Sequence, residues 1–453
     1  MRRIKVAIVS LPVLLVGSAF ALVVTAIGNR GAGGSFHDPR SFRHSNAAAP
    51  AAPWTLYDRD PNHVWNRLYR SLYRRIDRDG KEYGYDEIDP LLWPGTKYLL
   101  NQPANQQAVA ILDEFLATHA ERKIREPLKR AMLQRDLWAV FDWTAQVAAE
   151  SPAKSTLQIK IVQVMKRLAL SLAEISALPD TYREAVKATA FPATYDSNKG
   201  KQAFLPADLL DPKGSWISVS PRDSATPVAP GHAEAFSERS IFRVFIRLPG
   251  GRNATLNYLQ ELAEFPQHWL PDQEPPAPRL AVRGNPRVPQ FPAGTQLALV
   301  RQMVLIDSDG NLRPTNIIES IQIRVHRIVS NKLPESFFDG RIEAVNGMDT
   351  YEFKLSRPGL FSADTGGLRS VTAGEKEFTI FSSHGLDAFE QGDIAVEPLK
   401  ACVNCHTAPG IYSVRSHGGD LVPSRDQNQE PNATTSLKTS RPDWGLLQRF
   451  WRS

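Results

Sequence analysis

The sequence predicts an α+β protein: an all-helical N-terminal domain, then a mostly antiparallel β-rich domain and a C-terminal segment. Apolar residues recur at helical spacing between residues 54 and 195, whereas short alternating runs fill much of 239–395. The chain has 453 residues, of which 42% are hydrophobic, so it can bury proper cores.

Residues 1–28 are expected to direct the chain out of the cytoplasm. "MRRIK" is followed by an uncharged apolar run over 6–28, which is longer than most cleaved signals and about as long as a spanning helix. Both a signal peptide cleaved after Ala21 or after Gly28 and a retained membrane anchor remain open. We therefore expect an exported protein, either periplasmic or anchored to the outer face of the cytoplasmic membrane. Residues 29–53, rich in Gly, Ala, Pro and Ser, predict a flexible tether.

The predicted helical domain covers residues 54–195. Pro127 suits the first turn of a helix that continues through Leu137 and Phe141. Two further helices are predicted by apolar residues at a 3.6-residue period, namely Ala108, Ile111, Leu112, Phe115 and Leu116, and then Leu157, Ile161, Val164, Leu168, Leu172 and Ile175.

Residues 196–238 are expected to be a linker, because Pro, Ser, Asp and Gly are frequent there. The β-rich domain should follow over 239–395, with one helix at 254–265 and a hairpin turn at Asp309-Gly310. Its strands are predicted at 240–248, 295–306, 317–328, 350–356 and 376–383.

The C-terminal segment, residues 396–453, contains both cysteines of the chain in the sequence "CVNCH", at Cys402 and Cys405, directly before His406. On a helical turn, residues three apart share a face, so both thiols can meet one planar partner while the histidine reaches its centre. This arrangement suits a covalently attached haem, with thioether bonds from the cysteines and His406 as the proximal iron ligand.

At Cys402, Cys405 and His406 the segment resembles the haem-attachment site of c-type cytochromes. The resemblance covers about a dozen residues and implies one covalently attached haem c. The spacing of the cysteines also admits two other uses. A redox dithiol or disulfide would need a surrounding βαβ unit, and a zinc site would need a fourth ligand at the expected spacing.

The motif does not contain the second axial ligand of the iron. No methionine follows His406, which argues against the His/Met pair of small cytochromes. We expect His384, at the end of the last predicted strand, with His417 as the alternative. Met348 and an open or water-bound position complete the options.

These features predict an exported monohaem c-type cytochrome-like protein that works in one-electron transfer. A peroxidase-like enzyme with an open distal position, or a haem-containing binding or sensor protein, are the alternatives, so enzymatic activity stays undecided. The net charge of +6 suggests acidic headgroups or an acidic redox partner, whose identity the sequence does not give; nucleic acid is not expected outside the cytoplasm. Dinucleotide-binding, zinc-protease and serine-hydrolase motifs are missing from the sequence.

Overall fold

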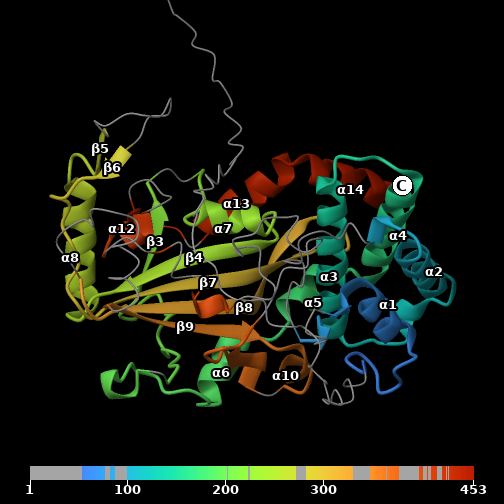
Figure 1. Cartoon of the computed structure of the whole chain (residues 1–453), viewed down its shortest axis with the longest axis horizontal. Helices are drawn as coiled ribbons and strands as arrows, with labels where there is room; N and C mark the ends of the chain where they lie inside the picture. Colours follow the sequence, from blue (N-terminus) through green and yellow to red (C-terminus); the bar gives the residue numbers. More distant parts are fainter. Residues whose placement is uncertain are drawn as a thin grey trace, which may run out of the picture. The chain divides into compact units, whose positions relative to one another are not determined.

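The computed structural model confirms an α+β fold, with most helices early in the chain and the strands later (Figure 1). The described residues are 54–76, 82–86, 99–200, 202–222, 225–271, 282–329, 347–363, 365–376, 397–400, 406, 410–415, 421–424, 426 and 428–453. Within them, residues from Trp54 onward belong to one compact unit. No helix in these ranges is long and apolar enough to span a membrane.

The α-helices are α1 (Val64–Tyr73), α2 (Ala104–Ala117), α3 (Pro127–Gln146), α4 (Pro152–Leu168), α5 (Leu172–Ser176), α6 (Thr181–Lys187), α7 (Pro230–Ala235), α8 (Gly251–Glu264), α10 (Arg357–Phe361), α12 (Tyr412–Arg415), α13 (Gln429–Ser440) and α14 (Pro442–Arg452). The short 3-10 helices are η3 (Ala120–Arg122), η4 (Ser197–Lys199) and η5 (Thr365–Gly367). Two of the expected helices, α3 and α8, begin at or close to their predicted positions.

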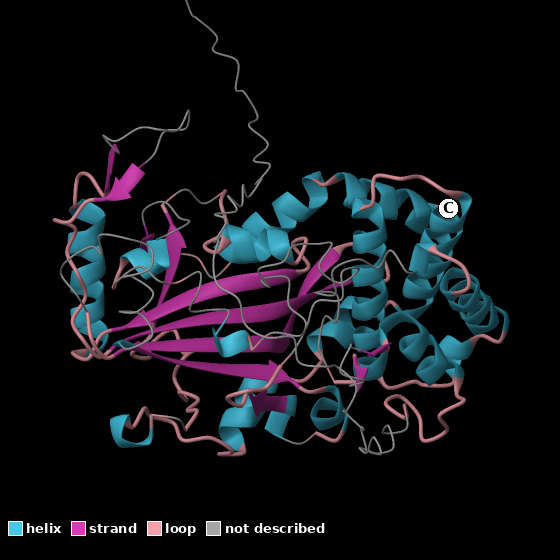
Figure 2. Ribbon diagram, in the orientation of Figure 1, coloured by secondary structure: helices cyan, strands magenta, loops and turns pink. Residues whose placement is uncertain are grey.

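Among the described residues, seven strands form one antiparallel sheet in the order β10-β9-β8-β7-β4-β3-β11 (Figure 2). They are β3 (Ile217–Pro221), β4 (Ser240–Arg247), β7 (Thr295–Ile306), β8 (Leu312–His326), β9 (Met348–Leu355), β10 (Leu368–Ser370) and β11 (Leu421–Pro423). Two small ribbons add β1 (Arg75–Ile76) with β2 (Glu82–Tyr83), and β5 (Trp269–Pro271) with β6 (Val282–Gly284).

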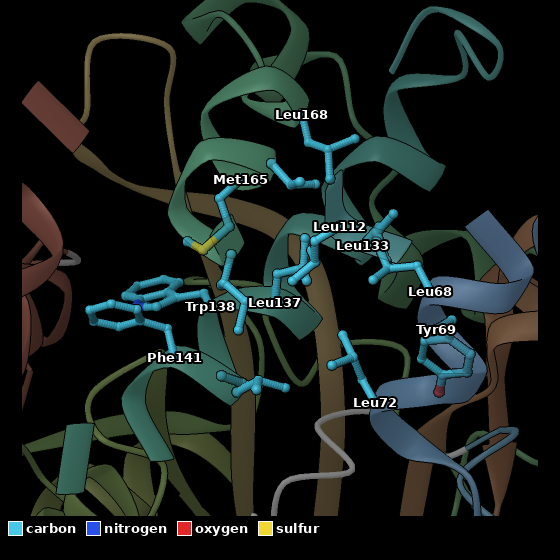
Figure 3. Packing of buried hydrophobic residues seen from close by; sticks show 14 of the residues in the cluster. Leu68, Tyr69, Leu72, Leu112, Leu133, Leu137, Trp138, Phe141, Met165 and Leu168 are labelled. Carbon is cyan, nitrogen blue, oxygen red and sulfur yellow. The ribbon is translucent and has the colours of Figure 1, made fainter. Parts of the chain in front are cut away.

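The helical half is built around α3, which is buried on all sides. Helix α2 packs against α1 and α4, and α4 packs against α3. Their apolar residues interlock as Figure 3 shows. The C-terminal helix α14 closes this core, with Trp444, Leu447 and Trp451 buried and the Trp444 ring 6.2 Å from that of Trp138. The C-terminal helix therefore covers the helical core.

One predicted helix is two helices. Helix α4 ends at Leu168, and α5 starts after Ser171, whose side chain caps the new helix while Glu174 returns the hydrogen bond. This reciprocal cap satisfies two backbone N–H groups and therefore favours the start of a new helix, α5, over the continuation of α4. As a result Leu172, which the helical period assigned to the core, is 55% exposed.

The central sheet has two covered faces. The face turned towards α6 contributes Phe245, Ala298, Val300 and Ile321 to a core with Tyr182 of that helix. The opposite face, here called the α7 face, carries Phe242 and Val244 of β4 opposite Arg301 and Leu299 of β7. Because side chains alternate along a strand, a shift of one residue in this register would exchange the two sets.

Buried ion pairs connect the helical half to the sheet. Asp142 of α3 accepts hydrogen bonds from Arg239, at 2.9 Å, and from Lys438 of α13, at 2.7 Å, with all three side chains fully buried. Arg135 of α3 lies 3.3 Å from Glu319 of β8. The helices and the strands thus share buried charges as well as apolar contacts.

The stretch expected to be a linker contains regular structure. Strand β3 pairs with β4 and β11, and α7 packs on β4. Both elements are short, so neither spans enough residues for a periodic pattern to stand out among the prolines and glycines around it. The predicted strand at 376–383 falls almost wholly outside the described residues.

Candidate functional site

The structure describes one residue of the predicted haem-attachment motif, His406. Cys402 and Cys405 lie outside the described residues, as do His384 and His417, the two predicted distal ligands. Met348 is described: it is the first residue of β9, is buried, and faces His326 of β8 in the strand register. The site is therefore built here from His406 and its surroundings.

A backbone carbonyl orients the imidazole of His406. Its Nδ1 lies 2.9 Å from the carbonyl oxygen of Ser413, next to the start of α12. A carbonyl oxygen can only accept, so Nδ1 carries a proton; in the neutral form of such a ring the lone pair is on Nε2. A metal-bound histidine usually donates its other ring N–H in this way, which fixes both the tautomer and the ring orientation.

The turn after the motif is anchored to the sheet. The backbone N–H of Ile411 donates to Oε1 of Gln290 at 3.0 Å, and the hydroxyl of Tyr412 donates to the carbonyl of Asn285. Ile411 and Tyr412 also join an apolar cluster that contains Ile246 of β4 and Leu297 of β7. These contacts hold the turn after the motif against β4, β7 and the loop that precedes β7.

A second histidine, His232 of α7, lies beside His406. Their ring centres are 6.3 Å apart, and their ring planes differ by only 9°. Both side chains are partly buried. Pro230 occupies the first turn of α7, where its missing N–H costs no hydrogen bond, so the helix can begin two residues before His232.

An aromatic platform on the α7 face supports His232. Its ring centre is 5.5 Å from that of Phe242 of β4, and Phe242 in turn lies 5.6 Å from Phe236, just after α7. The guanidinium carbon of Arg301 sits 4.3 Å from the ring centre of Phe236, within cation–π range. Packed rings of this kind restrict the rotamers available to the histidine above them.

A buried carboxyl group lies close to the start of α7. Glu430 of α13 accepts a hydrogen bond of 2.9 Å from the N–H of Val228, two residues before α7 begins. Burial raises the pKa of Glu430 to about 6, against the lowering effect of that hydrogen bond and of Arg243. Burial also lowers the pKa of the Arg243 guanidinium.

The described residues fit a haem at this place. One imidazole has its Nδ1 hydrogen-bonded to a carbonyl, and a second lies nearly parallel to it. The described residues contain no group of three or more His, Cys, Asp or Glu side chains able to hold a bare metal ion. A porphyrin supplies four of the iron's ligands itself, so it needs from the protein only axial donors of this kind.

Sequence reasoning did not select His232. It lies in the stretch assigned to a linker, between a Pro-Gly pair and a short Ala-rich run, and no motif surrounds it. The signal that identifies it is spatial: the sheet brings α7 and the segment after the motif to the same face. Comparison with protein-family models, curated proteins and solved structures finds no match for this chain.

Proposed function

We propose that this protein is an exported monohaem c-type cytochrome-like protein whose work is one-electron transfer. The observation that carries the proposal is the hydrogen bond from Nδ1 of His406, the last residue of the Cys-x-x-Cys-His sequence, to the carbonyl of Ser413. It prepares the histidine of the motif for iron ligation through Nε2.

Each residue of the proposed site has a separate task. Cys402 and Cys405 would hold one haem c through thioether bonds, and His406 would bind the iron. The Ser413 carbonyl keeps the His406 ring in one orientation and raises its basicity as a ligand. A bound haem supplies one reversible electron step between ferric and ferrous iron, exchanged with other one-electron redox proteins.

The charge of the chain fits an acidic redox partner. The net charge of +6 would draw a negatively charged protein towards this one and raise the rate of encounter at low salt. The apolar run over 6–28 supports export, with or without retention at the membrane surface. Export also suits the chemistry, because attachment of this kind of haem belongs outside the cytoplasm.

The test uses the full chain, exported in a bacterial host that carries the haem-attachment machinery. Denaturing gels stained for haem, together with reduced and oxidised absorption spectra, compare the wild type with Cys402→Ala/Cys405→Ala. We expect one haem that stays on the wild-type chain under denaturing conditions and is reduced and reoxidised reversibly, and none on the double variant.

A matched control removes a different pair of side chains of similar size. Ser436→Ala/Ser440→Ala, on α13, leaves both cysteines in place and should keep the haem. A wild-type chain that carries no covalent haem would overturn the proposal. Haem that remains covalently bound after both cysteines are removed would overturn the proposed mode of attachment.

A further inference from the structure

We propose that His232 is the second axial ligand of the haem iron, opposite His406. The inference deepens the proposed function and rests on it. It replaces His384 and His417, which the sequence favoured, by a residue with no surrounding motif.

The distance between the rings is the first support. A bond of about 2 Å from each imidazole nitrogen to a metal, plus about 1 Å from nitrogen to ring centre, separates two trans imidazole centres by about 6 Å. The observed separation of His232 and His406 is 6.3 Å. A full face-to-face sandwich would bring the ring centres closer, whereas an offset stack places them about 4.5–7 Å apart.

The ring planes are the second support. When two imidazoles bind one iron from opposite sides, the plane of each ring contains the line that joins the two ligating nitrogens through the iron. The protein sets the angle between the two planes. Here the planes of His232 and His406 differ by 9°, so the two rings are nearly parallel. An offset stack of two rings would also be parallel, and the experiment below separates the two cases.

The two histidines are held by independent anchors on one face of the sheet. His232 rests on Phe242 of β4 through α7. His406 is tied through Ser413 to a turn that packs on Ile246 and Leu297. Because both anchors belong to neighbouring strands of one sheet, the space between the rings is set before any ligand arrives.

A ligand at this position has a chemical consequence. With both axial positions filled by imidazole nitrogens, no site is left for peroxide or oxygen, which disfavours the peroxidase-like alternative. A methionine axial ligand raises the reduction potential of a haem, so a His/His pair predicts a lower potential than the His/Met pair of small cytochromes. Both features favour electron transfer.

The experiment replaces each candidate ligand in turn in the full, haem-loaded chain. His232→Ala, His384→Ala and His417→Ala are compared with the wild type and with His119→Ala, whose exposed side chain lies beside Glu121. Absorption and electron paramagnetic resonance spectra of the ferric protein give the spin state. Carbon monoxide, added to the ferrous protein, probes for an open position.

We expect a low-spin ferric wild type that binds carbon monoxide poorly. His232→Ala should become high-spin or water-ligated and bind carbon monoxide, and added imidazole should restore the low-spin spectrum. The other three variants should match the wild type. Haem staining of each variant shows that covalent attachment survives, and His232→Met provides a second replacement that should keep six ligands with a changed spectrum.

Three outcomes would overturn the inference. A low-spin spectrum in His232→Ala with covalent haem present would show that His232 only stacks on His406. The loss of the low-spin state in His384→Ala or His417→Ala instead would assign the ligand there. A wild type without covalent haem would remove the proposed function as well, which distinguishes the two failures.

Discussion

Asp136 of α3 and Arg357 of α10 are joined by two parallel hydrogen bonds, of 2.9 and 2.6 Å, between side chains at most 1% exposed. The guanidinium carbon also lies 4.9 Å from the ring centre of Tyr69, and the hydroxyl of Tyr57 donates to the same carboxylate at 3.3 Å. Burial, with the Asp136 charge second, raises the pKa of Tyr57 well above its ordinary value. This pair fastens the helical half to a helix that directly follows β9.

Asp136→Asn should destabilise the protein by about 3–5 kcal/mol, because the Arg357 charge would stay buried without its counter-charge. Asp113→Asn is the matched control: its ion pair with Lys160, at 2.7 Å, is about half exposed, and its loss should cost less than about 1 kcal/mol. Denaturant unfolding of both variants measures the difference. Equal losses of unfolding free energy in the two variants would contradict the prediction that the buried pair stabilises the protein more than the exposed pair.

Glu430→Gln should stabilise the protein near neutral pH. The folded-state pKa of Glu430, about 6, is above its ordinary value, so the folded state holds a proton that the unfolded state releases first. The wild type therefore loses stability as pH rises from about 4.5 to 6, in total by about 2 kcal/mol, and the loss is complete above that window. Glutamine stays neutral and can still accept from Val228.

The measurement is the free energy of unfolding at pH 4 and at pH 7. The advantage of Glu430→Gln over the wild type should be small at pH 4 and close to its full value at pH 7. Glu264→Gln, at an exposed position of α8, supplies the baseline for removing one negative charge. A constant difference at both pH values would refute the prediction.

His326 should give a pH dependence of opposite sign. Burial, with Arg324 second, lowers its pKa to about 3. Its folded-state pKa is below the ordinary value, so its contribution is complete above about pH 6.5 and is lost as pH falls towards 3, by about 1.4 kcal/mol per pH unit. Its ring lies 4.9 Å from Phe291, and its Nε2 has no hydrogen-bond partner among the described residues.

His326→Phe keeps an aromatic ring against Phe291 and cannot take up a proton. Relative to the wild type, it should gain about 2 kcal/mol on going from pH 7 to pH 5, measured by denaturant unfolding. His119→Asn, at a side chain 51% exposed, shows what the loss of an exposed histidine does. If the two variants respond alike to acid, the buried ring of His326 is not the cause.

Much of the fold follows from local patterns. The start of α3 at Pro127 and the β7–β8 hairpin at Asp309-Gly310 could be predicted, because each depends on one or two residues with restricted or permissive backbones. The hairpin glycine indeed has a left-handed φ of 84°. Such signals need no knowledge of what the element packs against.

Two features that the sequence did not reveal depend on distant partners. From the sequence alone, Asp142 would be assigned to the surface because it is charged. In the fold, β4 and α13 bring Arg239 and Lys438 to it, and all three side chains are buried. His232 can be recognised as a candidate ligand only from its position beside His406, because the sheet places α7 and the later turn on one face. A motif such as Cys-x-x-Cys-His is visible because its geometry is local, whereas a trans ligand need have no local geometry at all.

Gly410→Ala should loosen the turn that holds His406. Gly410 has φ of +55°, and a Cβ there would lie 2.0 Å from Oε1 of Gln290, the atom that accepts from Ile411. Gly374→Ala is the matched control, since that glycine has φ of +83° but no atom within 4 Å of the added Cβ. Both variants carry the strain of a left-handed alanine, and only the first displaces Gln290. We expect faster hydrogen exchange at Ile411–Ser413 and less covalently bound haem in Gly410→Ala alone; equal effects would show that backbone strain, and not the contact with Gln290, governs the turn.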